Sequence, residues 1–490
     1  MIPLIALVAC LFFVRALMNV DRQCSPGLSK ALWVPTVWFL YCATRPLSEW
    51  FQGGLFVDSS GKIGEGSFVD RYFLMVLLVI GLVILQKRRI NWQQTMRNNR
   101  WLFALFFFML VSILWSEFPF ISLKRWVRTT GTAIMALLVL SEAEPYEAMH
   151  AVLRRVIYIV IPFSVLLVKY YPAIGVGFGR WSGEPLYMGA STDKNTLGEV
   201  CSLWIFLYIW TLVGRRDKTN APAVRGQNMC DLIVVLMTLY LMKGPSGYGA
   251  SSATYSATSI AVLVFGLGVF LALRRFKAHL QNLGGWMTLA LFGVGLMALT
   301  MDLLDVSPAS LVAAALGRQA NLTGRGDLIW PVLLPIAWQH PVLGAGYGSS
   351  WVKPFPGLTL AINEAHNGYL EVFLELGVVG LILLALAVAM MFRKAKNELA
   401  ENFGWAAFRM SYLAMFLLHN WTETTLLRSR EVLWNLFVLF AVVYPQEWTG
   451  LAGDKASPAE EETAPEEDAL AIAGAPNSDL DNGIRAAVQW

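Results

Sequence analysis

Long apolar runs recur along most of the chain, and short polar segments separate them. A transmembrane helix needs roughly 17–25 apolar residues, so the shorter runs must borrow flanking residues. Backbone groups find no partner in lipid, and the runs are continuous rather than alternating, so we expect helices and not a β-barrel. The pattern predicts an all-α polytopic membrane protein of about 12–13 transmembrane helices. The runs lie at about 1–20, 31–48, 71–86, 101–116, 124–141, 151–169, 195–213, 229–243, 255–273, 285–303, 369–392, 405–419 and 431–445.

A polar island, Asp305–Gly380, interrupts this pattern and is rich in Arg, His and Gly. A long loop of this kind between membrane spans is more often functional than idle. After Trp448 the chain is acidic and rich in Ala, Pro, Ser and Gly, so we expect a disordered cytoplasmic tail without chemistry. The predicted parts are a helix bundle at 1–303, one large external loop at 304–368, further transmembrane helices at 369–445 and the tail at 446–490.

The placement of Lys and Arg predicts which loops face the cytoplasm. Cytoplasmic loops carry an excess of these residues. The basic loops are 87–100, 154–155, 215–225, 274–277 and 393–396. The polar island and the short loops at 49–70, 117–123, 170–194, 244–254 and 420–430 are then external, and the C-terminus is inside. Thirteen spans would put the N-terminus outside and twelve would put it inside.

Composition narrows the class of protein. The chain is 56% hydrophobic and only 15% charged, which excludes an ordinary soluble or disordered protein. Its five cysteines form no C-x-x-C pair, which argues against a disulfide framework or a zinc site. The two halves show no paired helices broken by Gly or Pro, which counts mildly against an inverted-repeat transporter.

Two candidate catalytic residues lie in the polar island. His366 comes directly before an apolar run, and a neutral imidazole with a pKa near about 6.5 can take a proton from a hydroxyl. Its location alone favours the alternative, a helix cap or an interfacial hydrogen bond. Asn367 could orient a sugar or hold the loop. Arg325 follows Thr323 at a predicted helix start, where a guanidinium suits a phosphate or pyrophosphate; a solvated arginine is the alternative.

Other polar groups share the predicted external side. His419–Glu423 either lines the same cavity or anchors the interface. Gly344–Gly348 superficially resembles a dinucleotide loop, but no strand precedes it, so we expect a tight turn that lets the backbone approach a ligand or another loop. Lys and Arg are usually in excess in cytoplasmic loops, so basic residues on the predicted external side are unusual. They suggest an anionic ligand, with contact to lipid phosphates as an equal alternative. These are Lys124, Arg125, Arg128, Arg180 and Lys194.

Taken together, these motifs resemble the O-antigen ligase family, which includes the lipid A-core:O-antigen ligases and the related O-antigen and exopolysaccharide polymerases. His366-Asn367, nine residues and then Gly377-Val-Val-Gly380 follow the ligase pattern. Four other segments are similar to the family's large periplasmic loop, its Lys-Asn-x-Leu-Gly segment and its fourth-to-fifth helix turn. They are 323–325, 340–346, 193–198 and 115–125.

The resemblance implies a GT-C-like fold in the bacterial inner membrane, with a periplasmic active site. It implies an inverting glycosyltransferase that needs neither metal nor cofactor. The donor would be a polyprenyl-pyrophosphate-linked glycan, and the acceptor a sugar hydroxyl on lipid A-core for a ligase or on a growing glycan for a polymerase. The lipid bilayer is the other partner, and no nucleic acid is involved. A non-enzymatic transporter of lipid-linked glycans is the competing class; it would place functional charges at mid-membrane.

The resemblance also assigns roles to residues. His366 would be the general base, and Arg325 would hold the pyrophosphate. One departure is that 243–259 has no arginine, although family ligases often place a second essential one there. Lys243 or Arg180 could take this role, but a lysine lacks the bidentate fork. The residues assigned to substrate or pyrophosphate binding are Lys194, Arg180, Lys243, Arg125 and Asn367.

Overall fold

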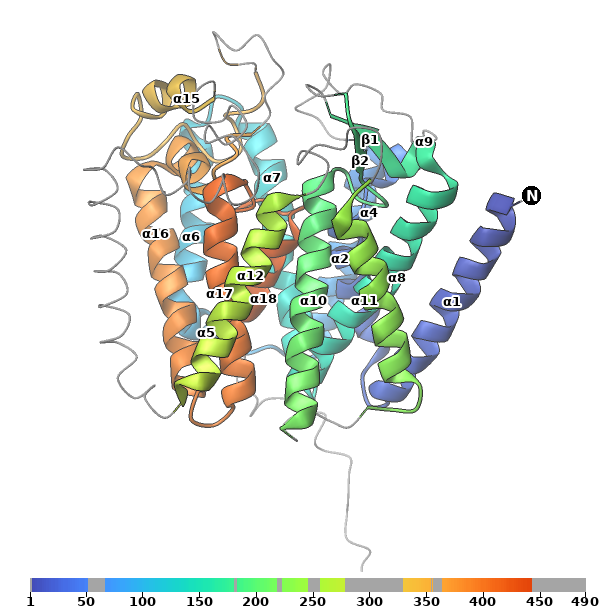
Figure 1. The fold of residues 1–490 in the computed structure, drawn as a ribbon. Helices are drawn as coiled ribbons and strands as arrows, with labels where there is room; N and C mark the ends of the chain where they lie inside the picture. Colours follow the sequence, from blue (N-terminus) through green and yellow to red (C-terminus); the bar gives the residue numbers. More distant parts are fainter. Residues whose placement is uncertain are drawn as a thin grey trace, which may run out of the picture. The chain divides into compact units, whose positions relative to one another are not determined.

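The helices of the computed structural model follow the predicted apolar runs (Figure 1). The structure describes residues 2–51, 67–179, 183–217, 223–245, 256–277, 329–353, 355 and 364–442. Each predicted run coincides with a helix except 285–303, which lies outside the described residues. The helices are α1 (Ile2–Cys24), α2 (Trp33–Ala43), α4 (Phe68–Lys87), α6 (Arg100–Val111), α7 (Pro119–Leu140), α8 (Pro145–Tyr170), α10 (Lys194–Arg216), α11 (Gln227–Lys243), α12 (Ala257–Arg275), α16 (Gly368–Glu398), α17 (Phe403–Thr422) and α18 (Val432–Ala441).

The predicted class, an all-α polytopic membrane protein, is confirmed. Within the described residues, six helices are long and apolar enough to cross a membrane. The number is seven if the bent pair of α5 (Trp92–Asn98) and the segment Arg100–Trp115, which includes the 3-10 helix η3 (Ser112–Trp115), is counted as one span. The total of 12–13 spans stays a prediction. The remaining short helices are η1 (Lys30–Leu32), α3 (Leu47–Phe51), α9 (Pro172–Gly175) and α15 (Trp330–Ala337).

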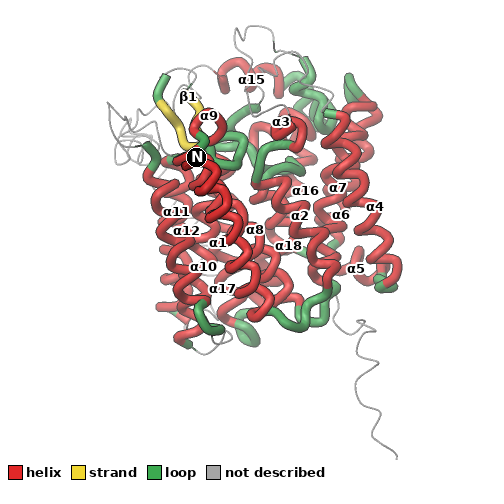
Figure 2. The backbone as a smooth tube through the Cα atoms, turned by 90° about the vertical axis from the view of Figure 1, so that its right-hand side faces the viewer, coloured by secondary structure: helices red, strands yellow, loops and turns green. Residues whose placement is uncertain are grey.

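A small antiparallel hairpin, β1 (Val176–Phe178) with β2 (Pro185–Tyr187), was not predicted. It lies in the segment expected to be an external loop, where three-residue strands are too short to leave an alternating pattern. Figure 2 shows β1, α3, α9 and α15 at one end of the helices and α5 toward the other. We refer to these as the α15 end and the α5 end.

The short helix α18 is the centre of the packing. All ten of its residues are buried, and it packs against α2, α7, α10, α16 and α17. Phe437 stacks on Phe416 of α17 with ring centroids 4.8 Å apart, and Trp38 of α2 donates a hydrogen bond to Asn435 at 2.7 Å. Such a helix cannot shift without disturbing its neighbours, so the loop before it, residues 423–431, is held in a defined place.

Helix α16 is sharply kinked at Gly377, where φ is +62°. A Cβ at this glycine would lie 2.3 Å from the Val342 carbonyl oxygen, so no other residue fits without rearrangement. The segment from Pro341 to Gly346 lies against the kink, and its backbone exchanges hydrogen bonds with residues 374–379 of α16. The predicted tight turn is therefore confirmed: Gly344, Gly346 and Gly348 all have positive φ, and the turn approaches another element closely.

Candidate active site

A polar cavity of about 320 Å³ opens among the helices near their α15 end. Residues of α2, α7, α10 and α16 line it, together with the turn at 347–351 and the loop 423–431. Four arginines contribute to its wall, two from α7 and two from the loop. They are Arg125, Arg128, Arg428 and Arg430, and the cavity also includes the carboxyl groups of Glu371, Glu375 and Glu431.

The two arginines of α7 reach the cavity because of where this helix begins. Pro119 occupies its first position, where a proline is well tolerated, so Arg125 and Arg128 fall within the first three turns. The guanidinium of Arg125 donates to the Gly348 carbonyl at 2.5 Å. The Tyr347 hydroxyl donates to the Leu427 carbonyl at 2.8 Å and lies 2.7 Å from Thr129 Oγ1. This tyrosine therefore ties the turn, α7 and the loop 423–431 together.

Arg428 is neutralised within the protein. Its guanidinium contacts Glu364 at 2.9 Å and Glu371 at 2.8 Å. Glu371 in turn accepts from Trp351 Nε1 at 2.5 Å. Burial by itself disfavours the cation, but the two carboxylates outweigh it and raise the pKa of Arg428 above its ordinary value. Arg428 therefore has a structural partner on each side and is less available to a ligand than its neighbours.

The other three arginines of the cavity form no ion pair with a described carboxylate, although Glu375 interacts electrostatically with Arg125. Arg125 contacts a backbone carbonyl, and Arg430 donates to the Thr44 carbonyl at 3.3 Å and lies over the ring of Tyr41. Arg128 forms no ion pair among the described residues. Burial raises the pKa of Glu431 well above its ordinary value, which favours its neutral form. The cavity thus concentrates positive charge, as an anion-binding site requires.

His366 lies between two carboxylates. Its Nδ1 is 3.0 Å from Glu364 Oε1 and 3.3 Å from Glu423 Oε2. Carboxylates on this side of the ring favour the tautomer with a proton on Nδ1, which leaves the lone pair on Nε2. The residue has a φ of +49°, which is uncommon outside glycine and is found most often where function requires it.

Asn367 explains how His366 is held at the beginning of α16. Its side-chain oxygen accepts from the backbone N–H groups of Tyr369 and Leu370, both at 3.0 Å, so Asn367 is the helix cap. A Cβ on Gly368 would lie 2.3 Å from Asn420 Oδ1, so a glycine lets the start of α16 meet the end of α17. Of the two roles considered for Asn367, holding the loop is the one that the structure records.

Glu364 connects the histidine with the cavity. One of its oxygens contacts His366 and the other contacts Arg428, which lines the cavity. Burial raises the pKa of Glu364, while the positive charge of Arg428 and the imidazole of His366 oppose this shift. The histidine and the arginines therefore belong to one continuous polar network.

The same three side chains could also hold a metal ion. The ligand atoms of Glu364, His366 and Glu423 all lie within 4.8 Å of one another, and carboxylate oxygen and imidazole nitrogen are common metal ligands. The sequence showed no acidic metal cluster on this side, because Glu423 is 57 residues from His366 and only the fold brings them together. Arg428 beside Glu364 and Asn195 beside Glu423 already supply hydrogen bonds to these carboxylates.

The remaining predicted residues do not gather in this cavity. Lys194 is the first residue of α10 and lines a smaller recess with Tyr187 and Ser256. Lys243 is the last residue of α11 and does not line the arginine cavity. Arg180 and Arg325 lie outside the described residues, so their roles stay predictions.

Sequence reasoning missed the loop that contributes most to the site. Arg428, Arg430 and Glu431 lie in or next to 420–430, a segment predicted to be external. Arginines there run against the inside bias, which is the signal that singled out Arg125. Applied to every external segment, this criterion would have found them. No comparable signal pointed to Glu364 or Glu371.

Two sequence comparisons relate this chain to known proteins. Residues 249–385 match the sequence model of a family described as O-Antigen ligase. The chain is also similar to the "Exopolysaccharide production protein ExoQ" of Rhizobium meliloti (strain 1021), with 26% identity over 359 residues, which covers 70% of this chain and 74% of that protein. The resemblance to the O-antigen ligase family, with its ligase and polymerase branches, is therefore confirmed.

Proposed function

We propose that the protein transfers a glycan from a polyprenyl-pyrophosphate carrier to a sugar hydroxyl at the periplasmic face of the inner membrane. The observation that carries this proposal is the cavity with three arginines that form no ion pair with a described carboxylate. A pyrophosphate carries several negative charges, and guanidinium groups bind phosphates with paired hydrogen bonds.

In this mechanism Arg125, Arg128 and Arg430 bind the pyrophosphate and stabilise the charge that develops as it leaves. Arg325, from the polar island, is proposed to complete the donor site. The guanidinium groups supply the positive charge that a metal ion provides in other transferases, so we propose that the reaction needs no metal.

His366 is proposed to act as the general base. The ring offers Nε2 to the acceptor hydroxyl, while Glu364 and Glu423 hold the proton on Nδ1. The acceptor oxygen attacks the anomeric carbon from the face opposite the pyrophosphate, and its proton passes to Nε2. A bond from carbon to the acceptor oxygen forms, the bond to the pyrophosphate oxygen breaks, and the electron pair leaves with the pyrophosphate. The single displacement inverts the anomeric centre.

A His366→Ala variant tests the proposal directly. In membranes supplied with lipid-linked glycan, we expect transfer to fall by roughly 10²–10⁴-fold, the usual contribution of a general base. The variant should still insert and bind the donor. His340→Ala is the matched control, because His340 is an exposed histidine of the same external segment. Glycan transfer at the parent rate by His366→Ala would refute the assignment.

A polymerase is the second candidate, and the similarity to an exopolysaccharide production protein favours it. A strain lacking the gene distinguishes the two activities. Long glycan chains that persist on the carrier but vanish from lipid A indicate a ligase. Single repeat units that accumulate, or secreted polysaccharide that disappears while lipopolysaccharide is intact, indicate a polymerase. Unchanged precursor and product pools would contradict both.

A further inference from the structure

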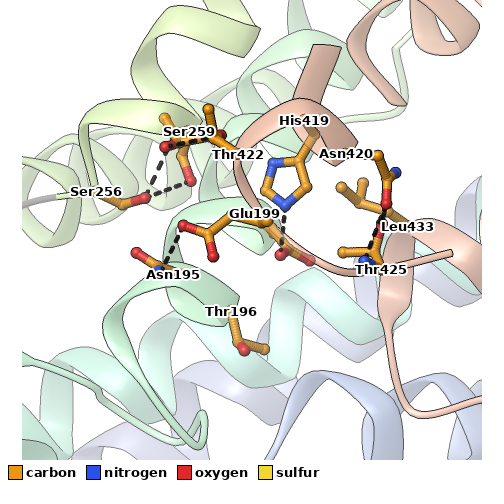
Figure 3. A network of polar contacts seen from close by, with 12 residues as sticks. Asn195, Thr196, Glu199, Ser256, Ser259, His419, Asn420, Thr422, Thr425 and Leu433 are labelled. Atoms are coloured by element: carbon orange, nitrogen blue, oxygen red, sulfur yellow. Dashed lines mark hydrogen bonds and ion pairs between the residues drawn. The ribbon is translucent and has the colours of Figure 1, made fainter. Parts of the chain in front are cut away.

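A second histidine and glutamate pair lies beneath the first, in the interior of the protein. His419 Nε2 of α17 is 3.0 Å from Glu199 Oε1 of α10 (Figure 3). The two residues are only 1% and 4% exposed, respectively. The catalytic scheme above uses neither of them. We call this contact the inner pair.

An outer pair joins the same two helices nearer the α15 end. Asn195 Nδ2 of α10 donates to Glu423 Oε1, just after α17, at 3.0 Å. Asn195 and Glu199 are four residues apart, as are His419 and Glu423, so each chain segment presents its two residues on one face, one turn apart. The outer pair determines where Glu423 points, and the second oxygen of Glu423 faces His366.

The chemistry of the inner pair is unusual for a contact that only packs two helices. A buried carboxylate and imidazole cost desolvation free energy, and apolar side chains of similar size usually pack as well or better. A buried polar pair instead restricts the helices to one register, because any shift leaves a polar group without its partner. The inner pair therefore fits a role in alignment rather than in stability.

The end of α17 connects the inner pair with His366 and with the arginine loop 423–431. Asn420, next to His419, accepts hydrogen bonds from the backbone N–H groups of Thr425 and Leu426, both at 3.0 Å. That turn leads directly to Arg428. A displacement of α17 against α10 would thus move Glu423 relative to His366 and move the arginine loop relative to the cavity.

We infer that Glu199 and His419 are positioning residues that hold Glu423 in the orientation that keeps the proton on Nδ1 of His366. This inference rests on the proposed function. Two carboxyl groups outside the inner pair, Asp193 and Glu423, act electrostatically on Glu199. Glu199 in turn acts on Glu431. A change in the inner pair therefore alters both the geometry and the charge around His366.

The test compares Glu199→Gln and His419→Gln with the parent chain in a glycan-transfer assay. We expect each variant to lower kcat roughly tenfold, to leave the KM for the donor within about twofold and to shift the acid limb of the pH profile. The matched control is His150→Gln, since His150 also contacts α10, through Thr211 at 3.0 Å, but lies outside the cavity. The control should keep the parent kcat.

A double variant separates positioning from packing. In a Glu423→Gln background, Glu199→Gln should lower kcat by less than about twofold further, because the residue through which it acts is already lost. Equal losses in both backgrounds would overturn the inference, and so would an unchanged kcat. If both inner variants fail to insert, the pair is structural and the inference is wrong. Full activity of His366→Ala would instead refute the proposed function, which keeps the two failures distinct.

Discussion

Arginines at the two ends of the helices have different surroundings. Toward the α5 end, buried arginines form ion pairs within the chain: Arg154 and Arg155 share Asp21, at 2.7 Å and 2.6 Å. Three further pairs, with a buried or half-buried arginine, are Arg88 with Glu142, Arg409 with Glu398 and Arg215 with Asp231. These ion pairs stabilise contacts between helices, and their carboxylates neutralise most of the positive charge of these arginines.

In the cavity toward the α15 end, only Arg428 among the four lining arginines forms an ion pair with a described carboxylate. Desolvating an unpaired cation costs free energy, so a fold that keeps three of them together gains nothing in stability. The comparison of the two ends teaches that ion pairing separates structural arginines from candidate ligand-binding arginines more clearly than their sequence positions do.

The largest effect on stability is expected when a buried ion pair loses its carboxylate. Asp21→Ala leaves Arg154 and Arg155 buried without a carboxylate, which should cost about 3–5 kcal/mol of unfolding free energy. Thermal unfolding in detergent measures this loss. Asp217→Ala breaks the more exposed pair with Arg274 and should cost less than about 1 kcal/mol. Equal losses in the two variants would contradict the distinction.

Removing a cavity arginine that forms no ion pair with a described carboxylate should lower transfer but not stability. Arg128→Ala and Arg430→Ala should each reduce kcat/KM for the lipid-linked donor by roughly 10²-fold, because a group that stabilises the leaving charge is lost. The unfolding temperature should not fall. Arg274→Ala, at an ion pair outside the cavity, serves as the control and should keep transfer within about twofold. Normal transfer by both cavity variants would show that the cavity does not bind the donor.

A smaller loss of transfer activity is expected when residue 430 keeps its positive charge but loses the guanidinium group. Arg430→Lys should reduce kcat/KM roughly tenfold, since an ammonium cannot make the paired hydrogen bonds of a guanidinium. The comparison with Arg430→Ala in the same assay separates charge from geometry. A lysine variant as poor as the alanine variant would mean that geometry alone matters.

The pH dependence of stability should also change at Glu364. Burial raises its pKa in the folded state, so its favourable contribution is present at low pH and is lost as pH rises through that pKa. Glu364→Gln resembles the protonated form and escapes this loss. As pH rises above the ordinary pKa of a glutamate, its unfolding temperature should therefore rise relative to the parent chain. A difference that stays constant with pH would contradict the direction of this shift.

The smallest effect is expected from chelation. Because guanidinium groups are proposed to supply the positive charge, treatment with EDTA should leave transfer unchanged within error. Loss of activity that added divalent metal restores would instead assign Glu364, His366 and Glu423 to a metal site.

Much of the fold could be predicted because membrane helices leave a strong local signal. Continuous apolar runs identified helices such as α8 and α10, and the glycines of 344–348 predicted a tight turn. The kink of α16 at Gly377 was not predicted. His366 was found through the spacing of a short motif. The β1–β2 hairpin was missed, because its strands are too short to show a period.

The contacts of the site could not be predicted in the same way. Apolar runs, basic loops and short motifs are properties of neighbouring residues, so the linear order of the chain is enough to recognise a polytopic membrane protein that resembles this family. Whether an arginine is neutralised depends on residues far away in the chain: Asn195 reaches Glu423 across 228 positions, and Arg428 reaches Glu364 across 64. Such pairing results from how α10, α16 and α17 pack around α18, because electrostatic partners are chosen by distance in space. The folded arrangement alone therefore shows which of the described charges form ion pairs within the chain, and the proposed donor site rests on the arginines that do not.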